Sequence, residues 1–447
     1  MLSLKEKKKA HFVGIGGVST SALAKLLLSY GWSVTGSDRA YSERLTELSE
    51  LGCRVWVGED AGSVGLPDLA VYSGAARYDN PELAFCRCLG IPVYERGAFL
   101  GAIAENFGCT IAIAGTHGKT TVTAMTTHLF HTAKREFCAH VGGDAVGYGN
   151  FFRTGDRYFV TEACEYRRSM LYLRPDLGVV LNVENDHPDT YRNLTELYDA
   201  FDDYLDKSRL KVLCGDTPYY RLRQCRNDVV TYGFSPENRF VAENVVLQNN
   251  GCYGFSISEY GNLLCDIELN VPGRHNVLNA LSSFVIGRLT GADISMLVEG
   301  LATYRGTRRR YETAGLFFGA TLVSDYAHHP DEILAAVATA RERTKKGRIL
   351  AVFQPHTYSR TARLFNEFCS CFTGCDEVIL VKEYPARETP DNGKTAKELF
   401  EGVKNPHKKY CDTLVDAAAY LQKNVAPGDT VLILGAGDVA LLVDLLK

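Results

Sequence analysis

Short apolar runs alternate with longer amphipathic stretches along the whole chain. The runs are short enough to be strands, and the stretches between them repeat apolar residues at the spacing of one helix face. This alternation predicts an α/β protein with mostly parallel sheets, because strands joined by helices lie parallel. A chain of 447 residues has room for about three domains. We expect them at residues 1–107, 108–312 and 313–447.

The first domain opens with an apolar run, a glycine turn and a helix-like stretch. Gly14, Gly16 and Gly17 form the turn, and Asp38 follows the next apolar run. This order predicts a Rossmann-like βαβ unit whose glycines face a diphosphate and whose acid meets a ribose hydroxyl. Ser19 stands where the full pattern has its third glycine. The pattern alone does not distinguish NAD from a UDP-sugar.

A second glycine turn opens the middle domain, directly after another apolar run. It reads Gly115, Thr116, His117, Gly118, Lys119, Thr120 and Thr121. Main-chain N–H groups of such a turn bind phosphate, the lysine neutralises the outer phosphates, and a threonine hydroxyl can hold Mg²⁺. The standard pattern has a glycine five residues before Gly118, where this chain has Ile113. The order of strand, turn and helix still favours phosphate binding over a turn without a ligand, in a central P-loop ATPase-like domain.

Polar residues follow the later strands of the middle domain. Glu162 comes directly after the apolar run 157–161, and His187 follows the run 178–183. In open α/β sheets, ligands gather at the carboxyl ends of the strands. Both residues are therefore expected where the glycine turn opens, and there they could hold a metal. A solvated strand end and a helix-capping group are the alternatives for Glu162 and His187, respectively.

The third domain is also expected to be Rossmann-like. Its predicted strands are 320–324, 348–353, 377–381 and 430–434, and most of them are followed by polar or glycine-rich segments. Three histidines in these segments, His328, His329 and His356, could be interpreted as a zinc site. Their spacing lacks a matched fourth ligand, which disfavours zinc.

Composition and charge narrow the function classes. A net charge of −4 gives no reason to expect nucleic acid or a membrane surface, and no apolar stretch is long enough to span a bilayer. The arginines at 305 and 308–310 lack the interleaved aromatic residues of a nucleic-acid surface. The 14 cysteines are scattered, which fits a reducing cytoplasm. Cys369, Cys371 and Cys375 lie among phenylalanines at helical spacing, which favours a buried helix face over a metal site.

Taken in order, these motifs resemble the Mur ligase family over nearly the whole chain. The segments that carry the resemblance are 14–17, 36–38, 115–120, 162–166, 185–187, 273–280, 309–312, 325–330 and 353–361. The family's shortened loop, Gly-Thr-x-Gly-Lys-Thr, accounts for the missing early glycine. His117 at the x position is similar to the alanine-adding members and to the ligase that recycles murein tripeptide.

The resemblance implies an ATP-dependent enzyme that forms an amide bond in peptidoglycan precursor synthesis. The acid would be UDP-N-acetylmuramate, activated as an acyl phosphate, and the amine would be L-alanine. The implied cofactors are ATP and Mg²⁺. Phosphoryl transfer between anions needs charge neutralisation and alignment more than covalent help. We expect a cytoplasmic monomer or homodimer without nucleic-acid or membrane partners.

The resemblance also implies a role for each candidate residue. Residues expected to bind ATP are Gly115, Thr116, His117, Gly118, Lys119, Thr120, Thr121, Asn276 and Arg310. Expected metal ligands are Thr120, Glu162 and His187, and expected catalytic residues are Lys119, His187, Arg310 and His328. The UDP portion would contact Gly14, Gly16, Gly17, Ser37, Asp38 and Ser73. The amino acid and the incoming phosphate would contact Tyr326, His328, His356 and Arg360.

Three alternatives remain open at this point. The murein tripeptide recycling ligase has the same fold, and a non-catalytic regulator could keep the nucleotide site. A nicotinamide-dependent oxidoreductase would need neither the phosphate loop nor the metal-ligand candidates. The chain departs from many family members at residues 18–20, 164–168 and 357. These departures bear on fine substrate contacts more than on the ATP chemistry.

Overall fold

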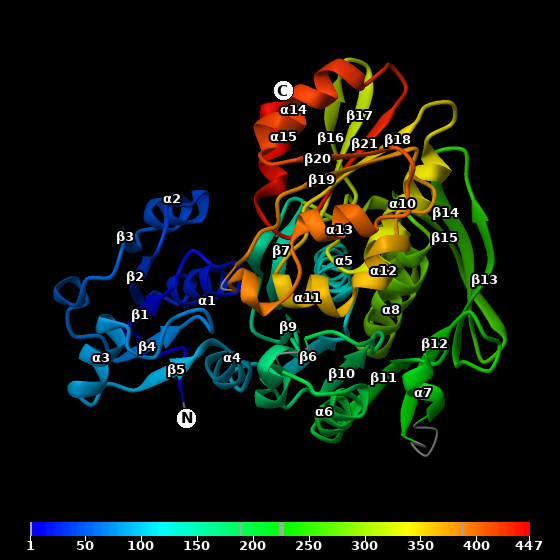
Figure 1. Ribbon diagram of the computed structural model, residues 1–447. Coiled ribbons are helices and arrows are strands. Elements are labelled where there is room, and N and C mark those ends of the chain that lie inside the picture. Colours follow the sequence, from blue (N-terminus) through cyan, green and yellow to red (C-terminus); the bar gives the residue numbers. More distant parts are fainter. Residues whose placement is uncertain (1, 188–189, 223–227, 387) are drawn as a thin grey trace. The chain divides into compact units, whose positions relative to one another are not determined.

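A computed structural model of the protein describes residues 2–187, 190–222, 228–386 and 388–447 (Figure 1). Three sheets follow one another along the chain, and most of their strand pairs are parallel. The α/β prediction is therefore confirmed. The chain forms two compact units. The first contains Met1–Glu243, Ile257–Cys265 and Asn279–Leu301, and the second contains Asn244–Ser256, Asp266–Leu278 and Ala302–Lys447.

The first sheet has five parallel strands in the order β3-β2-β1-β4-β5. Its strands are β1 (Lys9–Val13), β2 (Ser33–Asp38), β3 (Arg54–Val57), β4 (Leu69–Tyr72) and β5 (Val93–Glu95). Its helices are α1 (Val18–Ser29), α2 (Glu43–Glu50), α3 (Pro81–Cys88) and α4 (Arg96–Ala104). The segment 36–38 belongs to β2, so Asp38 is the last residue of a strand beside the glycine turn that follows β1.

The second sheet has ten strands in the order β15-β14-β13-β12-β11-β10-β6-β9-β7-β8. They are β6 (Cys109–Ala114), β7 (Phe137–Ala145), β8 (Gly149–Arg153), β9 (Tyr158–Glu162), β10 (Leu177–Val180), β11 (Leu210–Cys214), β12 (Val229–Gly233), β13 (Phe240–Leu247), β14 (Cys252–Glu259) and β15 (Asn262–Pro272). The helices are α5 (Lys119–Thr132), α6 (Leu194–Asp206), α7 (Pro218–Leu222), α8 (His275–Leu289) and α9 (Ile294–Thr303). Because β6 lies between β10 and β9, the turn after β6 is flanked by the ends of both neighbours.

The third sheet has six strands in the order β16-β17-β21-β18-β19-β20, of which β16 is antiparallel to β17. They are β16 (Glu312–Phe317), β17 (Ala320–Asp325), β18 (Ile349–Phe353), β19 (Glu377–Val381), β20 (Lys408–Cys411) and β21 (Thr430–Leu434). The helices are α10 (Pro330–Arg343), α11 (Tyr358–Arg363), α12 (Phe365–Ser370), α13 (Ala396–Gly402), α14 (Leu414–Asn424) and α15 (Leu442–Leu445). Alternate strand residues enter two separate buried clusters, one with α10 and α12 and the other with α14 and α15. Burial on both faces explains why these strands are continuous apolar runs.

Cys369 and Cys371 are buried as expected and Cys375 is partly buried against the same apolar cluster, but the helix is shorter than their spacing suggested. Cys369 lies in α12, which ends at Ser370, and Cys371 lies just beyond it in the same apolar cluster. Burial raises the pKa of both thiols, so they behave as apolar groups. No helix among the described residues has the length and apolar composition that crossing a membrane requires.

Candidate functional site

The glycine turn after β6 needs both of its glycines. Gly115 has φ +144°, and a Cβ there would lie 3.0 Å from the Cβ of Leu181. Gly118 has φ +86°, and a Cβ there would lie 2.8 Å from Oδ1 of Asn279. Both dihedrals are in the region that side chains rarely adopt. The turn therefore ends at Gly118, which has no side chain to cover the main chain. Helix α5 begins at the next residue, Lys119.

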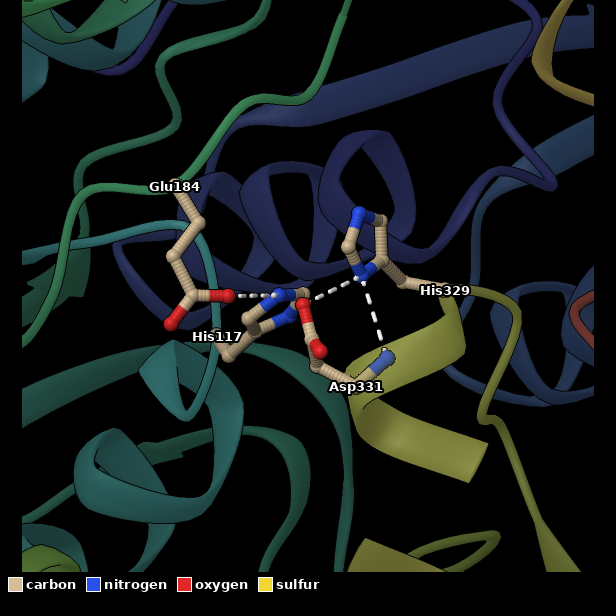
Figure 2. Close-up of side chains that lie close together, drawn as sticks. All are labelled: His117, Glu184, His329 and Asp331. Carbon is tan, nitrogen blue, oxygen red and sulfur yellow. Dashed lines mark hydrogen bonds and ion pairs between the residues drawn. The ribbon is translucent and has the colours of Figure 1, made fainter. Parts of the chain in front are cut away.

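The segment that follows β10 braces this turn. The main-chain N–H of His117 donates to Oδ1 of Asn182 over 2.8 Å, and Nδ2 of Asn182 donates back to the His117 carbonyl over 3.1 Å. The N–H of Glu184 donates to the Thr116 hydroxyl over 2.8 Å. Nε2 of His117 lies 3.2 Å from Oε2 of Glu184 (Figure 2). The predicted strand 178–183 ends early, at Val180, because its last residues leave the sheet to make these bonds.

Lys119 is paired with a buried carboxylate that the sequence analysis did not select. Nζ of Lys119 lies 2.9 Å from Oε2 and 3.1 Å from Oε1 of Glu165. The ammonium also donates to the main-chain carbonyls of Gly115 and Thr116. Burial would lower the pKa of Lys119, but the charge and hydrogen bond of Glu165, together with the charges of Cys164 and Glu162, outweigh burial and raise that pKa above its usual range. The lysine is therefore held as a cation inside the turn.

His187 contacts the same carboxylate. Its Nε2 lies 3.2 Å from Oε1 of Glu165 and 3.6 Å from Oδ2 of Asp186. The residue has φ +55°, an uncommon value for a side-chain-bearing residue. Burial would raise the pKa of Glu165, but the Lys119 charge and the His187 hydrogen bond outweigh it, and the pKa lies below its usual range. Glu165 thus joins two of the predicted catalytic residues.

Glu162 is fixed at the end of β9. Its Oε1 accepts the main-chain N–H of Gly142 over 2.6 Å. A Cβ at Gly142 would lie 2.5 Å from the same carboxylate, so a larger residue there would displace the Glu162 side chain. Thr120 is buried in the first turn of α5. A hydroxyl and a carboxylate are oxygen donors of the kind that a hard cation prefers.

The first glycine turn is held by β2 and by the turn after β4. The N–H groups of Gly14 and Ile15 donate to the Ser37 carbonyl over 2.8 and 3.0 Å, and the Gly16 N–H donates to Oδ2 of Asp38 over 2.9 Å. A Cβ at Gly14 would lie 2.9 Å from the Cβ of Ser73. The side chain of Ser37 is buried, and its hydroxyl donates to Glu82. Its main chain, not its hydroxyl, faces the glycine turn.

In the second unit, Glu332 contacts two other predicted catalytic residues, His328 and Arg310. The main-chain N–H of His328 donates to Oε2 of Glu332 over 3.0 Å, and Nδ1 of His328 lies 3.3 Å from the same oxygen. Nη1 of Arg310 lies 4.0 Å from Oε1 of Glu332, and its guanidinium lies 5.1 Å from the Tyr326 ring centre. Glu332 also closes a capping box with His329 at the start of α10. Figure 2 shows the His329 part of this cap, where the Asp331 main-chain N–H donates to Nδ1 of His329 over 3.4 Å.

The remaining predicted residues of the second unit lie in the segment and helix α11 that follow β18, and at the start of α8. Arg360 is buried, and its Nη1 lies 3.3 Å from Nδ1 of His356. The rings of His356 and His328 have centres 6.1 Å apart. Nδ2 of Asn276 donates to the Pro272 carbonyl over 2.7 Å. Within the described parts of the chain, His328, His329 and His356 do not bring their ring nitrogens together at metal-ligand distances.

Asp325 is a further buried acid in this region. It ends β17 and accepts the main-chain N–H groups of Tyr311 and Ala327 over 2.6 and 2.7 Å. Burial raises its pKa to about 6, against the opposing charge of Arg310. The neighbouring Arg309 donates over 2.6 Å to the Gly435 carbonyl. Arg309 and Arg310 therefore both contact groups of the second unit.

Family models match three consecutive parts of the chain. The Mur ligase family catalytic domain matches residues 9–108, the Mur ligase middle domain matches 113–287, and the Mur ligase glutamate ligase domain matches 309–437. The chain is 38% identical to UDP-N-acetylmuramate–L-alanine ligase from Clostridium beijerinckii, over 98% of the chain and 97% of the relative. It belongs to the Mur ligase family.

Other Mur ligases are also similar to this chain. The chain is 39% identical to UDP-N-acetylmuramate–L-alanine ligase from Lachnospira eligens, over 96% of the chain and 95% of that relative. The crystal structure of UDP-N-acetylmuramate–alanine ligase from Thermotoga maritima matches with a TM-score of 0.85 and 27% identity, over 98% of both chains. A murein peptide ligase from Psychrobacter arcticus matches with a TM-score of 0.75 at 21% identity, which speaks for the fold alone.

Sequence reasoning missed the residues that hold the predicted ones in place. Asn182 and Glu332 belong to none of the quoted motifs, whereas Glu165 lies inside the quoted segment 162–166 but was given no role. Glu165 comes three residues after Glu162, just past the end of β9, where acids of an α/β sheet meet ligands.

Proposed function

We propose that this protein is an ATP-dependent ligase that joins L-alanine to the carboxylate of UDP-N-acetylmuramate in peptidoglycan precursor synthesis. The observation that carries the proposal is Lys119, held as a cation in a glycine turn that follows β6, a strand with parallel neighbours on both sides. Relatives that share more than a third of its residues over nearly the whole chain bear the name of this activity.

The reaction has two steps. A carboxylate oxygen of UDP-N-acetylmuramate forms a bond to the γ-phosphorus of ATP while the bond to the ADP oxygen breaks. The amine of L-alanine then attacks the acyl carbon, loses a proton and expels phosphate. Each step brings anions together, so fixed positive charge lowers the barrier. Lys119 would face the β- and γ-phosphates, and Arg310 would face the γ-phosphate.

Magnesium would be held by Thr120 and Glu162, with His187 toward the acyl phosphate. The donors fit, since the carboxylate of Glu162 is fixed by Gly142 at the strand end and Thr120 opens α5. When bound, the ion supplies charge neutralisation for the phosphate oxygens. Asn276 would contact the adenine.

The three predicted domains divide the substrates among them. Residues 1–107 would bind the UDP portion with Gly14, Gly16, Gly17 and Asp38, residues 108–312 would bind ATP, and residues 313–447 would bind L-alanine. Arg360 is the natural partner for the alanine carboxylate, because a planar guanidinium matches a carboxylate with two parallel hydrogen bonds. Tyr326, His328 and His356 would complete that pocket. Ser37 would act through its main chain.

Phosphate release from ATP tests this function. Purified protein with Mg²⁺, ATP and UDP-N-acetylmuramate should release phosphate when L-alanine is added. A preformed tripeptide in place of L-alanine should give at least tenfold less. Faster release with the tripeptide would identify the recycling ligase instead, and ATP binding without release in either case would indicate a regulator.

A further inference from the structure

The carboxylate of Glu165 lies between the glycine turn after β6 and the segment after β10. Its side chain is only 1% exposed, and it contacts both Lys119 and His187 within 3.2 Å. The backbone around it is tightly constrained. The Tyr191 hydroxyl donates to the Glu165 carbonyl over 2.6 Å, and Arg167 and Arg168 both have positive φ, at 50° and 55°. Such strain is retained where the surroundings impose it.

All the donors of Lys119 are taken by this arrangement. A lysine has three N–H groups. The carbonyls of Gly115 and Thr116 and the carboxylate of Glu165 accept them. Of these acceptors only Glu165 is charged, so it is the strongest competitor that a phosphate would meet at Nζ. A buried ion pair is also costly to break unless an equal charge replaces the lost partner.

We propose that Glu165 is a positioning residue for the ligation reaction. It holds Lys119 and His187 on one carboxylate, and it competes with the nucleotide for the lysine. The expected change in kcat rests on the proposed function, whereas the expected change in ATP affinity does not. Glu165 thereby keeps the lysine aligned at the cost of some ATP affinity.

The Glu165→Gln variant tests both parts of the proposal. Glutamine keeps the size and one acceptor oxygen but removes the charge. We expect Mg²⁺–ATP to bind three- to tenfold more tightly in calorimetry without the other substrates, and kcat for ligation to fall at least tenfold. A merely structural role would weaken both quantities. Unchanged or weaker ATP binding, or an unchanged kcat, would overturn the proposal.

Two further variants isolate the carboxylate. Tyr191→Phe removes the hydrogen bond to the Glu165 main chain and leaves its side chain in place, so ATP affinity should stay within twofold of wild type. In a Lys119→Ala background, Glu165→Gln should no longer tighten ATP binding. If it still does, the carboxylate repels phosphate directly and does not compete for the lysine.

The design also separates the inference from the proposed function. If the wild type binds ATP but does not ligate, the proposed function fails while the affinity comparison still decides the competition with Lys119. If Glu165→Gln does not fold, as judged by thermal unfolding, Glu165→Asp replaces it. Aspartate keeps the charge but withdraws the carboxylate by one methylene group, which weakens its contacts with both Lys119 and His187. Tighter ATP binding with reduced kcat is therefore again expected, and the opposite result again overturns the proposal.

Discussion

Glu165 in the first unit and Glu332 in the second each hold two residues that we assign to the reaction, but they do so differently. Glu165 is 1% exposed and binds an ammonium and an imidazole through its side chain. Glu332 is 15% exposed, and its hydrogen bonds go mainly to the main-chain N–H groups of His328 and His329. The first is an ion pair inside the protein, and the second is a helix cap that also faces a guanidinium and an imidazole.

The difference in surroundings sets the expected energetics. A charge pair removed from water interacts strongly, and loss of one partner leaves the other uncompensated. A capping glutamate contributes about 1 kcal/mol through the main chain whether or not a cation is near. Substitutions at Glu165 should therefore act through charge, and substitutions at Glu332 mainly through geometry. The following predictions test that contrast.

The largest effect is expected at the lysine itself. Lys119→Ala removes the cation that we propose to face the phosphates, and we expect ligation to fall about a thousandfold or more. Binding of UDP-N-acetylmuramate, measured by calorimetry, should change less than threefold. Lys25 is a matched control, since it is also a buried lysine paired with an acid, Glu47, at 2.6 Å. If Lys119→Ala and Lys25→Ala lose activity equally, the Lys119 pair is structural.

A smaller effect is expected at Glu332. Glutamine can still accept the main-chain N–H groups of the cap, so Glu332→Gln should lower kcat only three- to tenfold and leave stability nearly unchanged. Glu332→Ala also removes the cap, which should cost about 1 kcal/mol more in urea unfolding. Equal kinetic losses in the two variants would mean that the charge beside Arg310 and His328 matters more than the cap.

The same contrast explains what could be predicted from the sequence. β19 and β21 match the predicted strands 377–381 and 430–434 residue for residue, because runs buried on both faces are visible in the chain itself. The order of strand, turn and helix around Lys119 was also visible. The role of each motif residue in binding stays a prediction.

The partners of these residues could not be read in the same way. Ser37 was expected at the substrate, yet its hydroxyl is bound to Glu82, a residue 45 positions away. Glu165 and Lys119 are 46 positions apart. Side-chain pairs of this kind depend on how strands and helices pack, and no local periodicity records them. Sequence motifs therefore suggest which groups could meet ligands, but they do not reveal the side chains that hold those groups in place.

The smallest effect on activity is expected at Glu82, a buried carboxylate without a predicted catalytic partner. Glu82 is therefore compared with Glu165 and Glu332. It accepts hydrogen bonds from the Trp56 indole over 3.1 Å, from the Asp60 main chain over 2.9 Å and from Ser37. We expect Glu82→Gln to leave kcat within twofold of wild type. The variant should nevertheless lose about 2 kcal/mol of unfolding free energy at pH 7, since a buried charged acceptor is removed.

The pH dependence of that loss gives a check on its cause. Burial would raise the pKa of Glu82, but the hydrogen bonds from His11, Asp60 and Ser37 outweigh it, and the pKa lies below the usual value of 4.5. A carboxyl whose pKa is lower in the folded state stabilises the protein above its unfolded-state pKa and loses that contribution as the pH falls through the folded-state pKa. The stability gap between wild type and Glu82→Gln should therefore be full at pH 7 and shrink below about pH 4.5 in urea titrations. A gap that stays constant down to pH 3.5 would mean that Glu82 acts through its shape alone, and burial of a carboxylate would then not suffice to explain Glu165 either.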